Sequence, residues 1–364
     1  MHTTRPGAAR GALALSLVLL GACGGGMAGA METAPRPSAG APMPAADRDM
    51  QAVLDQLAAL GARPVETLSV EQARAQPSPA DAVKALLQQQ GRSTAPEPVE
   101  SVRDRTVPGP AGPIPVRVYT PAGTGPFPVI VYVHGGGWVI ANLDTYDASA
   151  RALANAANAV VVSVEYRHAP ENRFPAAHED TWAAYRWVVA NTAQVGGDPE
   201  RIAVAGESAG GNMAANLSIR ARDEGVKLPV HQLLVYPVAG TDMNTPSYLQ
   251  NANAKPLSRG GMMWFARHTL RSPADAADRR LDLVAADLAG LPPTTIIAAE
   301  IDPLRSEGSV LAERLRAAGV DVDYQSFEGA AHEFFGMGAV VGDARDAVIR
   351  AGARLRASFA RGGM

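Results

Sequence analysis

The chain has 364 residues, with 33 Lys and Arg against 36 Asp and Glu, so the formal net charge is −3. Hydrophobic residues make up 47% and charged residues 19%, a composition typical of globular rather than disordered proteins. The near-neutral charge argues against a nucleic-acid-binding protein, which needs a clustered basic excess. A single Cys excludes an internal disulfide framework and a cysteine-based metal cage.

The N-terminal segment has the pattern of a targeting signal. Residues 1–10 contain Arg5 and Arg10 and no acid, and residues 11–22 are apolar apart from one Ser. This apolar run is shorter than the roughly 20 residues that span a bilayer. It ends in Leu-Gly-Ala before Cys23, which resembles a bacterial lipobox. We expect a lipoprotein-type signal peptide over residues 1–22 and a lipid on Cys23 that anchors the protein to a membrane of the cell envelope.

The alternative is an ordinary secretory signal cleaved near Ala30, which would leave a secreted or periplasmic protein. Residues 23–46 are rich in Gly, Ala and Pro, a composition typical of a flexible tether. Residues 47–60 have apolar residues at helical spacing. Ser78 followed by Pro79 predicts the start of a second short helix. We expect these helices, within residues 47–95, to contribute to a cap.

Apolar β-branched runs alternate with helical patterns from residue 99 onward. The expected strands cover residues 116–120, 129–133, 160–166, 201–205, 231–236, 294–299 and 323–327. The expected helices cover residues 146–158, 176–191, 209–223, 306–318 and 344–359. This order predicts an α/β fold with a mostly parallel central sheet and helices on both faces. Residues 241–288 interrupt the alternation and predict a helical insertion above the sheet.

The strand at 201–205 runs into Gly206-Glu207-Ser208-Ala209-Gly210 and then a helix. This is a G-x-S-x-G motif between a strand and a helix, where a sharp turn exposes the Ser hydroxyl. The glycines relieve crowding around the strained Ser, and the helix N-terminus favours developing negative charge. Ser208 is therefore the expected nucleophile.

A second motif, from His134 through three glycines to Trp138, directly follows the strand at 129–133. Glycines leave backbone N–H groups accessible, so this loop is expected to form an oxyanion hole. A phosphate-binding loop fits less well, because neither G-x-G-x-x-G nor a following Lys is present. The expected donors are Gly136, Gly137 and Ala209, and Trp138 is a candidate substrate contact.

A serine nucleophile needs a base and an acid that orients it, and here both are expected after the Ser. Asp302 lies just past the strand at 294–299, with Glu300 as a competitor nearer the strand. His332 follows the strand at 323–327 on a loop of small residues and is the expected base. Among the other histidines, His134 is expected to brace the glycine loop.

These motifs together resemble the hormone-sensitive-lipase-like (bacterial family IV) esterases of the α/β-hydrolase fold. The resemblance covers residues from about 50 to about 360 and rests on five motifs in order, His134-Gly-Gly-Gly-Trp138, Tyr166-Arg-His-Ala-Pro-Glu171, Gly206-Glu-Ser-Ala-Gly-Gly211, Asp302-Pro-Leu304 and His332-Glu-Phe334. It implies a triad of Ser208, Asp302 and His332, and a cap formed by the N-terminal helices together with the insertion at 241–288. The chain departs from many relatives at Glu207, where Asp is frequent, and at Glu333, where Gly is common. Glu333 is expected to alter the position or pKa of His332.

The resemblance implies a serine-dependent carboxylic ester hydrolase that acts on short to medium acyl esters through an acyl-enzyme. It implies no metal or organic cofactor and a small-molecule ester as the partner. Hydrolysis of amides, carbamates or lactones by the same triad remains an alternative, as does a non-catalytic ligand-binding role. A homodimer is left open.

Overall fold

The computed structural model describes residues 42–362. The expected signal peptide, Cys23 and all but the last residues of the expected tether lie outside them. Within residues 42–362, no helix is both long enough and apolar enough to cross a membrane.

An eight-stranded sheet forms the centre of the fold, in the order β1-β2-β4-β3-β5-β6-β7-β8. The pairs β1/β2 and β2/β4 are antiparallel, and all later neighbours are parallel. The strands are β1 Ser101–Gly109, β2 Gly112–Thr120, β3 Phe127–Val133, β4 Val160–Val164, β5 Gly197–Glu207, β6 Gln232–Val235, β7 Thr294–Ile301 and β8 Val322–Ala331. The predicted mostly parallel sheet is confirmed.

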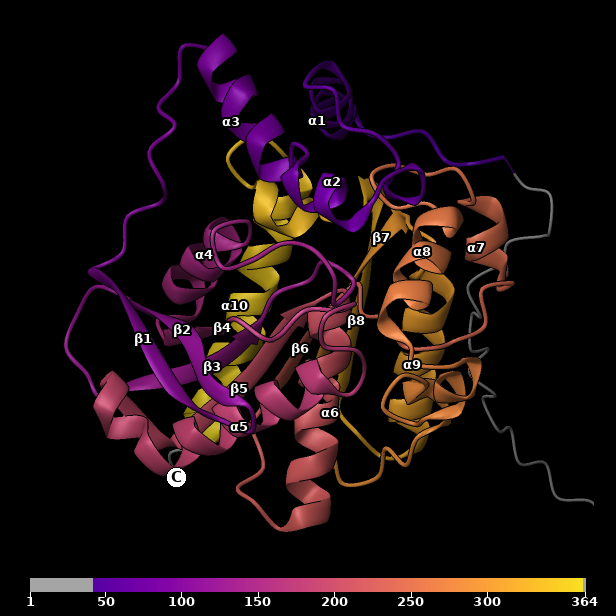
Figure 1. Ribbon diagram of the computed structural model, residues 1–364. Helices are drawn as coiled ribbons and strands as arrows, with labels where there is room; N and C mark the ends of the chain where they lie inside the picture. Colours follow the sequence, from indigo (N-terminus) through magenta and orange to yellow (C-terminus); the bar gives the residue numbers. More distant parts are fainter. Residues whose placement is uncertain (1–41, 363–364) are drawn as a thin grey trace, which may run out of the picture. The chain divides into compact units, whose positions relative to one another are not determined.

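Helices cover both faces of this sheet (Figure 1), with α5 and α6 on one face and α4 and α10 on the other. Every residue of β3 is buried, but alternate side chains enter different cores. Val129, Val131 and Val133 pack with α5 and α6, whereas Ile130 and Tyr132 pack with α4 and α10. Two-sided burial explains why this strand is apolar throughout. The covering helices are α4 Asp147–Ala157, α5 Ala176–Asn191, α6 Ala209–Glu224, α9 Arg305–Ala317 and α10 Gly342–Gly362.

The hairpin at the edge of the sheet was only partly predictable. β1 was not expected, and β2 begins at Gly112, earlier than the expected 116. Most residues of β1 are exposed, and its middle carries Arg103, Asp104 and Arg105. An edge strand of this kind has no apolar period to reveal it.

Of the remaining helices, those of the N-terminal segment 48–89 lie at the top of Figure 1, and those of segment 246–269 lie at the right beside α9. They are α1 Arg48–Ala59, α2 Val70–Ala75, α3 Pro79–Gln89, α7 Pro246–Gln250 and α8 Arg259–Thr269. The predicted helix start at Ser78 is confirmed, since its side chain accepts from the backbone of Asp81 in a capping box. Short 3₁₀ segments connect other elements, at Val65–Thr67, Thr192–Val195, Pro273–Ala277, Leu283–Ala285 and Phe334–Met337.

Candidate active site

Ser208 stands at the sharp turn between β5 and α6. Its backbone is strained, with φ 56° and ψ −119°. This turn presses the flanking glycines against other backbone: a Cβ on Gly206 would lie 2.2 Å from the carbonyl oxygen of Gly210, and one on Gly210 would lie 2.0 Å from that of Val133. Only glycine fits at either position, which is the physical reason for the G-x-S-x-G pattern.

His332 connects this serine to a buried carboxylate. The Oγ atom of Ser208 lies 3.0 Å from Nε2 of His332, and Nδ1 of His332 lies 2.7 Å from Oδ2 of Asp302. All three side chains are almost completely buried. Because the carboxylate only accepts, Nδ1 carries the proton and Nε2 presents a lone pair to the hydroxyl. The arrangement can therefore move a proton from Ser208 to His332.

Two hydrogen bonds hold Asp302 in place. Its second oxygen accepts from the N–H of Leu304 at 2.8 Å, and its carbonyl oxygen accepts from the Asn251 amide at 3.1 Å. Glu300, the competing acid, instead accepts from the N–H of Gly329 at 2.9 Å. Of the two acids, the structure brings Asp302 to the imidazole. Asn251 was not predictable, because nothing in its neighbourhood in the sequence signals this contact.

The glycine loop brings two backbone N–H groups beside the serine. Gly136 and Gly137 line the same cavity as Ser208 and have φ values of +92° and +56°. The Tyr166 hydroxyl donates to the Gly135 carbonyl at 2.7 Å, which fixes the loop. Within residues 42–362 the N–H groups of Gly136, Gly137 and Ala209 have no acceptor. They are free to bind an oxyanion.

Trp138 does not face this cavity. Its backbone has a positive φ of 62°. Its side chain is only 6% exposed and stacks beside the His178 ring, with the ring centroids 6.1 Å apart. It is absent from the residues that line the cavity. Trp138 thus packs in the core, and we do not retain it as a substrate contact.

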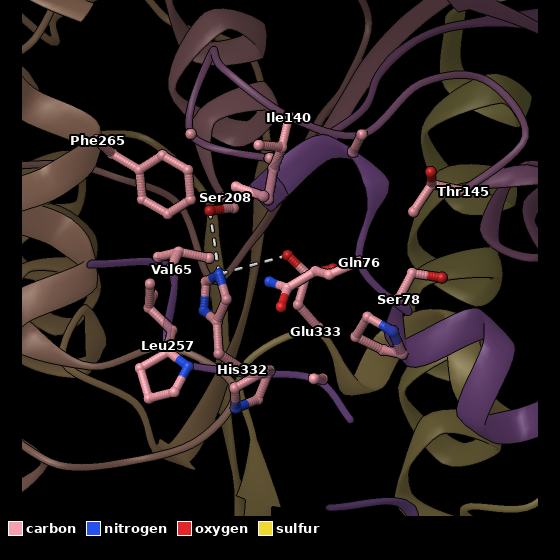
Figure 2. Close-up of a pocket in the computed structure, with 18 of the residues that line it drawn as sticks. Val65, Gln76, Ser78, Ile140, Thr145, Ser208, Leu257, Phe265, His332 and Glu333 are labelled. Atoms are coloured by element: carbon pink, nitrogen blue, oxygen red, sulfur yellow. Dashed lines mark hydrogen bonds and ion pairs between the residues drawn. The ribbon is translucent and has the colours of Figure 1, made fainter. Parts of the chain in front are cut away.

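The cavity above Ser208 has a volume of about 870 Å³. Figure 2 shows Ser208 and His332 between Phe265, Val65 and Leu257 on one side and Gln76, Ser78 and Thr145 on the other. Its walls come from the segment that contains α1–α3, from the glycine loop and from residues 253–265. Its size and mixed lining suit a small organic molecule.

A second carboxylate, Glu333, lies beside the imidazole. Glu333 lines the cavity and places Oε1 3.7 Å from Nε2 of His332. Its oxygens accept from the Tyr146 hydroxyl, each at 2.7 Å. Burial lowers the pKa of His332, but the charge and hydrogen bond of Asp302, with smaller contributions from Glu333 and Glu207, outweigh it, so the pKa is raised above its ordinary value. Tyr146 was not predictable as part of this site.

Glu207 is buried beneath the serine. Burial, together with the charge of Glu333, raises the pKa of Glu207 to about 7. The hydroxyls of Tyr132 and Tyr236 donate to its two oxygens. This carboxyl supports the turn from below and does not contact the cavity.

The sheet, the serine turn and the His–Asp pair define a hydrolase of the α/β type. A family model described as the alpha/beta hydrolase fold matches residues 130–336, and the chain belongs to this family. It is 44% identical over 248 residues to carboxylesterase NlhH of Mycobacterium tuberculosis, which covers 67% of this chain and 78% of the relative. Esterase LipI of the same species is 43% identical over 264 residues, 70% of this chain and 81% of the relative.

A solved structure supports the same family assignment. The hyperthermophilic esterase from Pyrobaculum calidifontis superimposes with a TM-score of 0.78 at 37% identity, covering 86% of this chain and 99% of that one. The chain is therefore an enzyme of the esterase class, and the predicted resemblance to hormone-sensitive-lipase-like esterases is confirmed.

Proposed function

We propose that this enzyme hydrolyses carboxylic esters through an acyl-enzyme on Ser208. The observation that carries the proposal is the pair of contacts that join Ser208 to His332 at 3.0 Å and His332 to Asp302 at 2.7 Å. In this mechanism His332 takes the hydroxyl proton as Ser208 attacks the ester carbonyl. Asp302 holds the imidazole tautomer and stabilises its cationic form.

The N–H groups of Gly136, Gly137 and Ala209 bind the oxyanion of the tetrahedral intermediate. Ala209 is the first residue of α6, so its N–H adds the positive end of the helix dipole. His332 then protonates the leaving alcohol. Water, activated by the same imidazole, releases the carboxylic acid and restores Ser208.

The helices α1–α3 and the segment 241–288 act in this proposal as the cap that shapes the substrate site. The cavity of about 870 Å³ includes apolar side chains from both segments, such as Leu57, Val65, Met262 and Phe265. Such a lining suits an apolar acyl group, and the resemblance to the family IV esterases is the reason to propose short to medium acyl chains. The relatives' names support an ester as the substrate: one at 31% identity is the ethyl acetate hydrolase of Pseudomonas putida.

The test compares p-nitrophenyl esters of increasing acyl length with matched p-nitroanilides, which separates an esterase from an amide hydrolase. We expect turnover to be highest on short or medium esters and much lower on anilides. Ser208→Ala should lower ester turnover by roughly 10⁶-fold. Ser218→Ala is the matched control, because Ser218 is buried on the same helix and its Oγ has no partner among the described residues. A folded wild type that turns over no ester would instead support a ligand-binding protein.

A lipid on Cys23 is the second part of the proposal. Its basis is the apolar segment 11–22 followed by Leu-Gly-Ala-Cys. Several acyl chains on one residue would hold the enzyme stably on a bilayer. Cys23→Ser should move the protein from the detergent phase to the aqueous phase when membranes are dissolved and separated in a phase-separating detergent. Unchanged membrane retention would contradict the anchor.

A further inference from the structure

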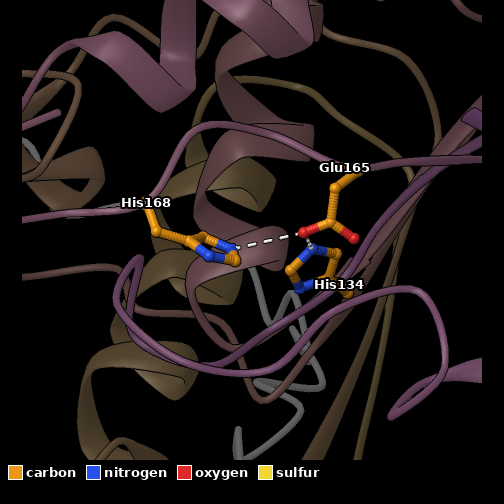
Figure 3. A group of neighbouring side chains, drawn as sticks. All are labelled: His134, Glu165 and His168. Carbon is orange, nitrogen blue, oxygen red and sulfur yellow. Dashed lines mark ion pairs between the residues drawn. The ribbon is translucent and has the colours of Figure 1, made fainter. Parts of the chain in front are cut away.

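Three potential metal ligands meet behind the glycine loop. They are His134, Glu165 and His168, whose ligand atoms all lie within 4.8 Å of one another. Figure 3 shows both imidazoles directed at the Glu165 carboxylate. The proposed ester hydrolysis uses none of these side chains to bind substrate or to transfer a proton.

The tautomer of His134 is determined by its neighbour. Nδ1 lies 2.9 Å from the carbonyl oxygen of Gly135, and since a carbonyl only accepts, Nδ1 carries the proton. Nε2 of the neutral ring therefore has a lone pair. That atom is fully buried and has no hydrogen-bond partner among the described residues. A histidine that donates its other N–H to a backbone carbonyl is oriented as metal-ligating histidines are.

The two other groups face the same point. Oε1 of Glu165 lies 3.8 Å from Nε2 of His134 and 3.6 Å from Nε2 of His168. The Nε2 atom of His168 also has no partner within residues 42–362. The second oxygen of Glu165 accepts from the N–H of Leu143 at 2.9 Å, which holds the carboxylate in place.

We propose that His134, Glu165 and His168 form a binding site for a divalent transition-metal ion of the Zn²⁺ type. Two imidazole nitrogens and one carboxylate suit zinc better than magnesium or calcium, which prefer oxygen ligands. With bonds of about 2.1 Å, tetrahedral ligand atoms lie about 3.4 Å apart. The separations of 3.6 and 3.8 Å between Glu165 and the two imidazoles need only a small contraction, and the ligand atoms of the two imidazoles lie within 4.8 Å of each other.

The site also has an entrance. Glu165 and His168 line the cavity above Ser208, whereas His134 lies behind them. An ion can enter from the cavity and keep a fourth position for water, as a three-ligand zinc site does. Arg74, a positive group that lines the same cavity, is paired with Glu171 at 2.8 Å.

Metal binding would act on the glycine loop through His134. The ring stacks on Tyr166 with centroids 4.4 Å apart, and the Tyr166 hydroxyl donates to the carbonyls of His134 and Gly135. A metal ion that fixes the His134 ring would therefore also restrict the position of the loop that contains Gly136 and Gly137. We expect Zn²⁺ to change the rate of ester turnover, but binding itself is the primary measurement.

The experiment is a titration of the full-length chain, without a polyhistidine tag, with ZnCl₂ in a calorimeter. We expect saturable binding of one equivalent. His168→Leu, which keeps the bulk but removes a ligand, should weaken binding by more than the roughly 10–100-fold that loss of an outer-shell partner costs. Glu165→Gln should do the same. Visible absorption of bound Co²⁺ should report a tetrahedral site in the wild type and not in His168→Leu.

Two control variants locate the ion. His268→Leu removes a histidine that does not line the cavity and should bind Zn²⁺ like the wild type. His332→Asn should also retain binding, which separates this site from the Ser208–His332 pair and from the proposed function. Equal binding by His168→Leu and His268→Leu would overturn the proposal. Absence of saturable binding in the wild type would also overturn it and would indicate a water or a proton between the three groups.

Discussion

The Glu333 carboxylate lies 3.7 Å from Nε2 of His332, on the side of the imidazole that contacts Ser208. The base proposed for the reaction is therefore placed between two carboxylates, Asp302 at Nδ1 and Glu333 near Nε2. Asp302 orients the ring, whereas Glu333 faces the cavity and is partly exposed. Its negative charge favours the imidazolium that forms when Ser208 is deprotonated.

The first prediction concerns the pH dependence of Glu333→Gln. The base must be neutral to accept a proton, so activity is lost as pH falls through the pKa of His332. Glu333 contributes to the raised pKa of His332. Removing its charge should lower that pKa and move the acid limb of the kcat/KM profile to lower pH. The profile is measured on one p-nitrophenyl ester, and an unmoved acid limb would mean that Glu333 has no influence on the base.

The second prediction separates the two acids near the end of β7. Asp302→Asn keeps the shape of the side chain but no longer holds the imidazole tautomer, so kcat should fall by about 10⁴-fold. Glu300→Gln is the control, since the Glu300 side chain accepts from the backbone N–H of Gly329 and does not contact the imidazole, and this variant should lose less than about tenfold. Steady-state kinetics of the two purified variants give the answer. A larger loss in Glu300→Gln would reverse the proposed roles.

The third prediction concerns the backbone contact between Gly210 and β3. A Cβ at Gly210 would lie 2.0 Å from the carbonyl oxygen of Val133 and 2.5 Å from that of His134. Gly210→Ala should therefore lower the free energy of unfolding by about 1–3 kcal/mol, as overpacking does, and reduce kcat by displacing the glycine loop. Chemical denaturation and kinetics measure the two effects.

Gly308→Ala is the matched control for that substitution. Gly308 lies inside α9, and a Cβ there would meet nothing within 4 Å. Alanine is favoured over glycine in a helix by up to about 1 kcal/mol, so this variant should be as stable as the wild type or more stable. Equal destabilisation of both variants would show that the close contact at Gly210 is not the cause.

The central sheet and the order of the site residues were predictable because their signals are local. Strands buried on both faces are apolar throughout, and β3 has this pattern over its whole length. The Ser208 turn needs glycine at fixed offsets, which leaves a motif in the sequence. The chain order of acid and base then limits the candidates to a few loops.

The remaining features depend on contacts between distant segments. The Tyr146 hydroxyl meets Glu333 across 187 positions, and no periodicity encodes such a pair. Trp138 follows the glycine loop directly, yet its positive φ accompanies a ring packed in the core beside His178. The polar edge strand β1 is stabilised by pairing with β2 rather than by its own burial, so its pattern resembles that of a loop.

The final prediction concerns Glu207 and the pH dependence of stability. Its pKa is raised from 4.5 to about 7, first by burial and then by the charge of Glu333. Between these two values the unfolded chain ionises while the folded protein holds the proton, so the free energy of unfolding falls as pH rises. The free energy of unfolding falls by a few kcal/mol in total, and this decrease is complete only above about pH 7.

Glu207→Gln removes this titration and keeps a polar group beside the Tyr132 and Tyr236 hydroxyls. Denaturation curves at several pH values from 4.5 to 8 should show the difference in stability, variant minus wild type, becoming more positive as pH rises. Glu313→Gln, at an exposed position on α9, is the control, and the difference between its stability and that of the wild type should not change with pH. If the free energy of unfolding of Glu207→Gln changes with pH in the same way as that of the wild type, the buried carboxyl does not hold its proton in the folded protein at neutral pH. The group beneath the Ser208 turn is then a charged carboxylate.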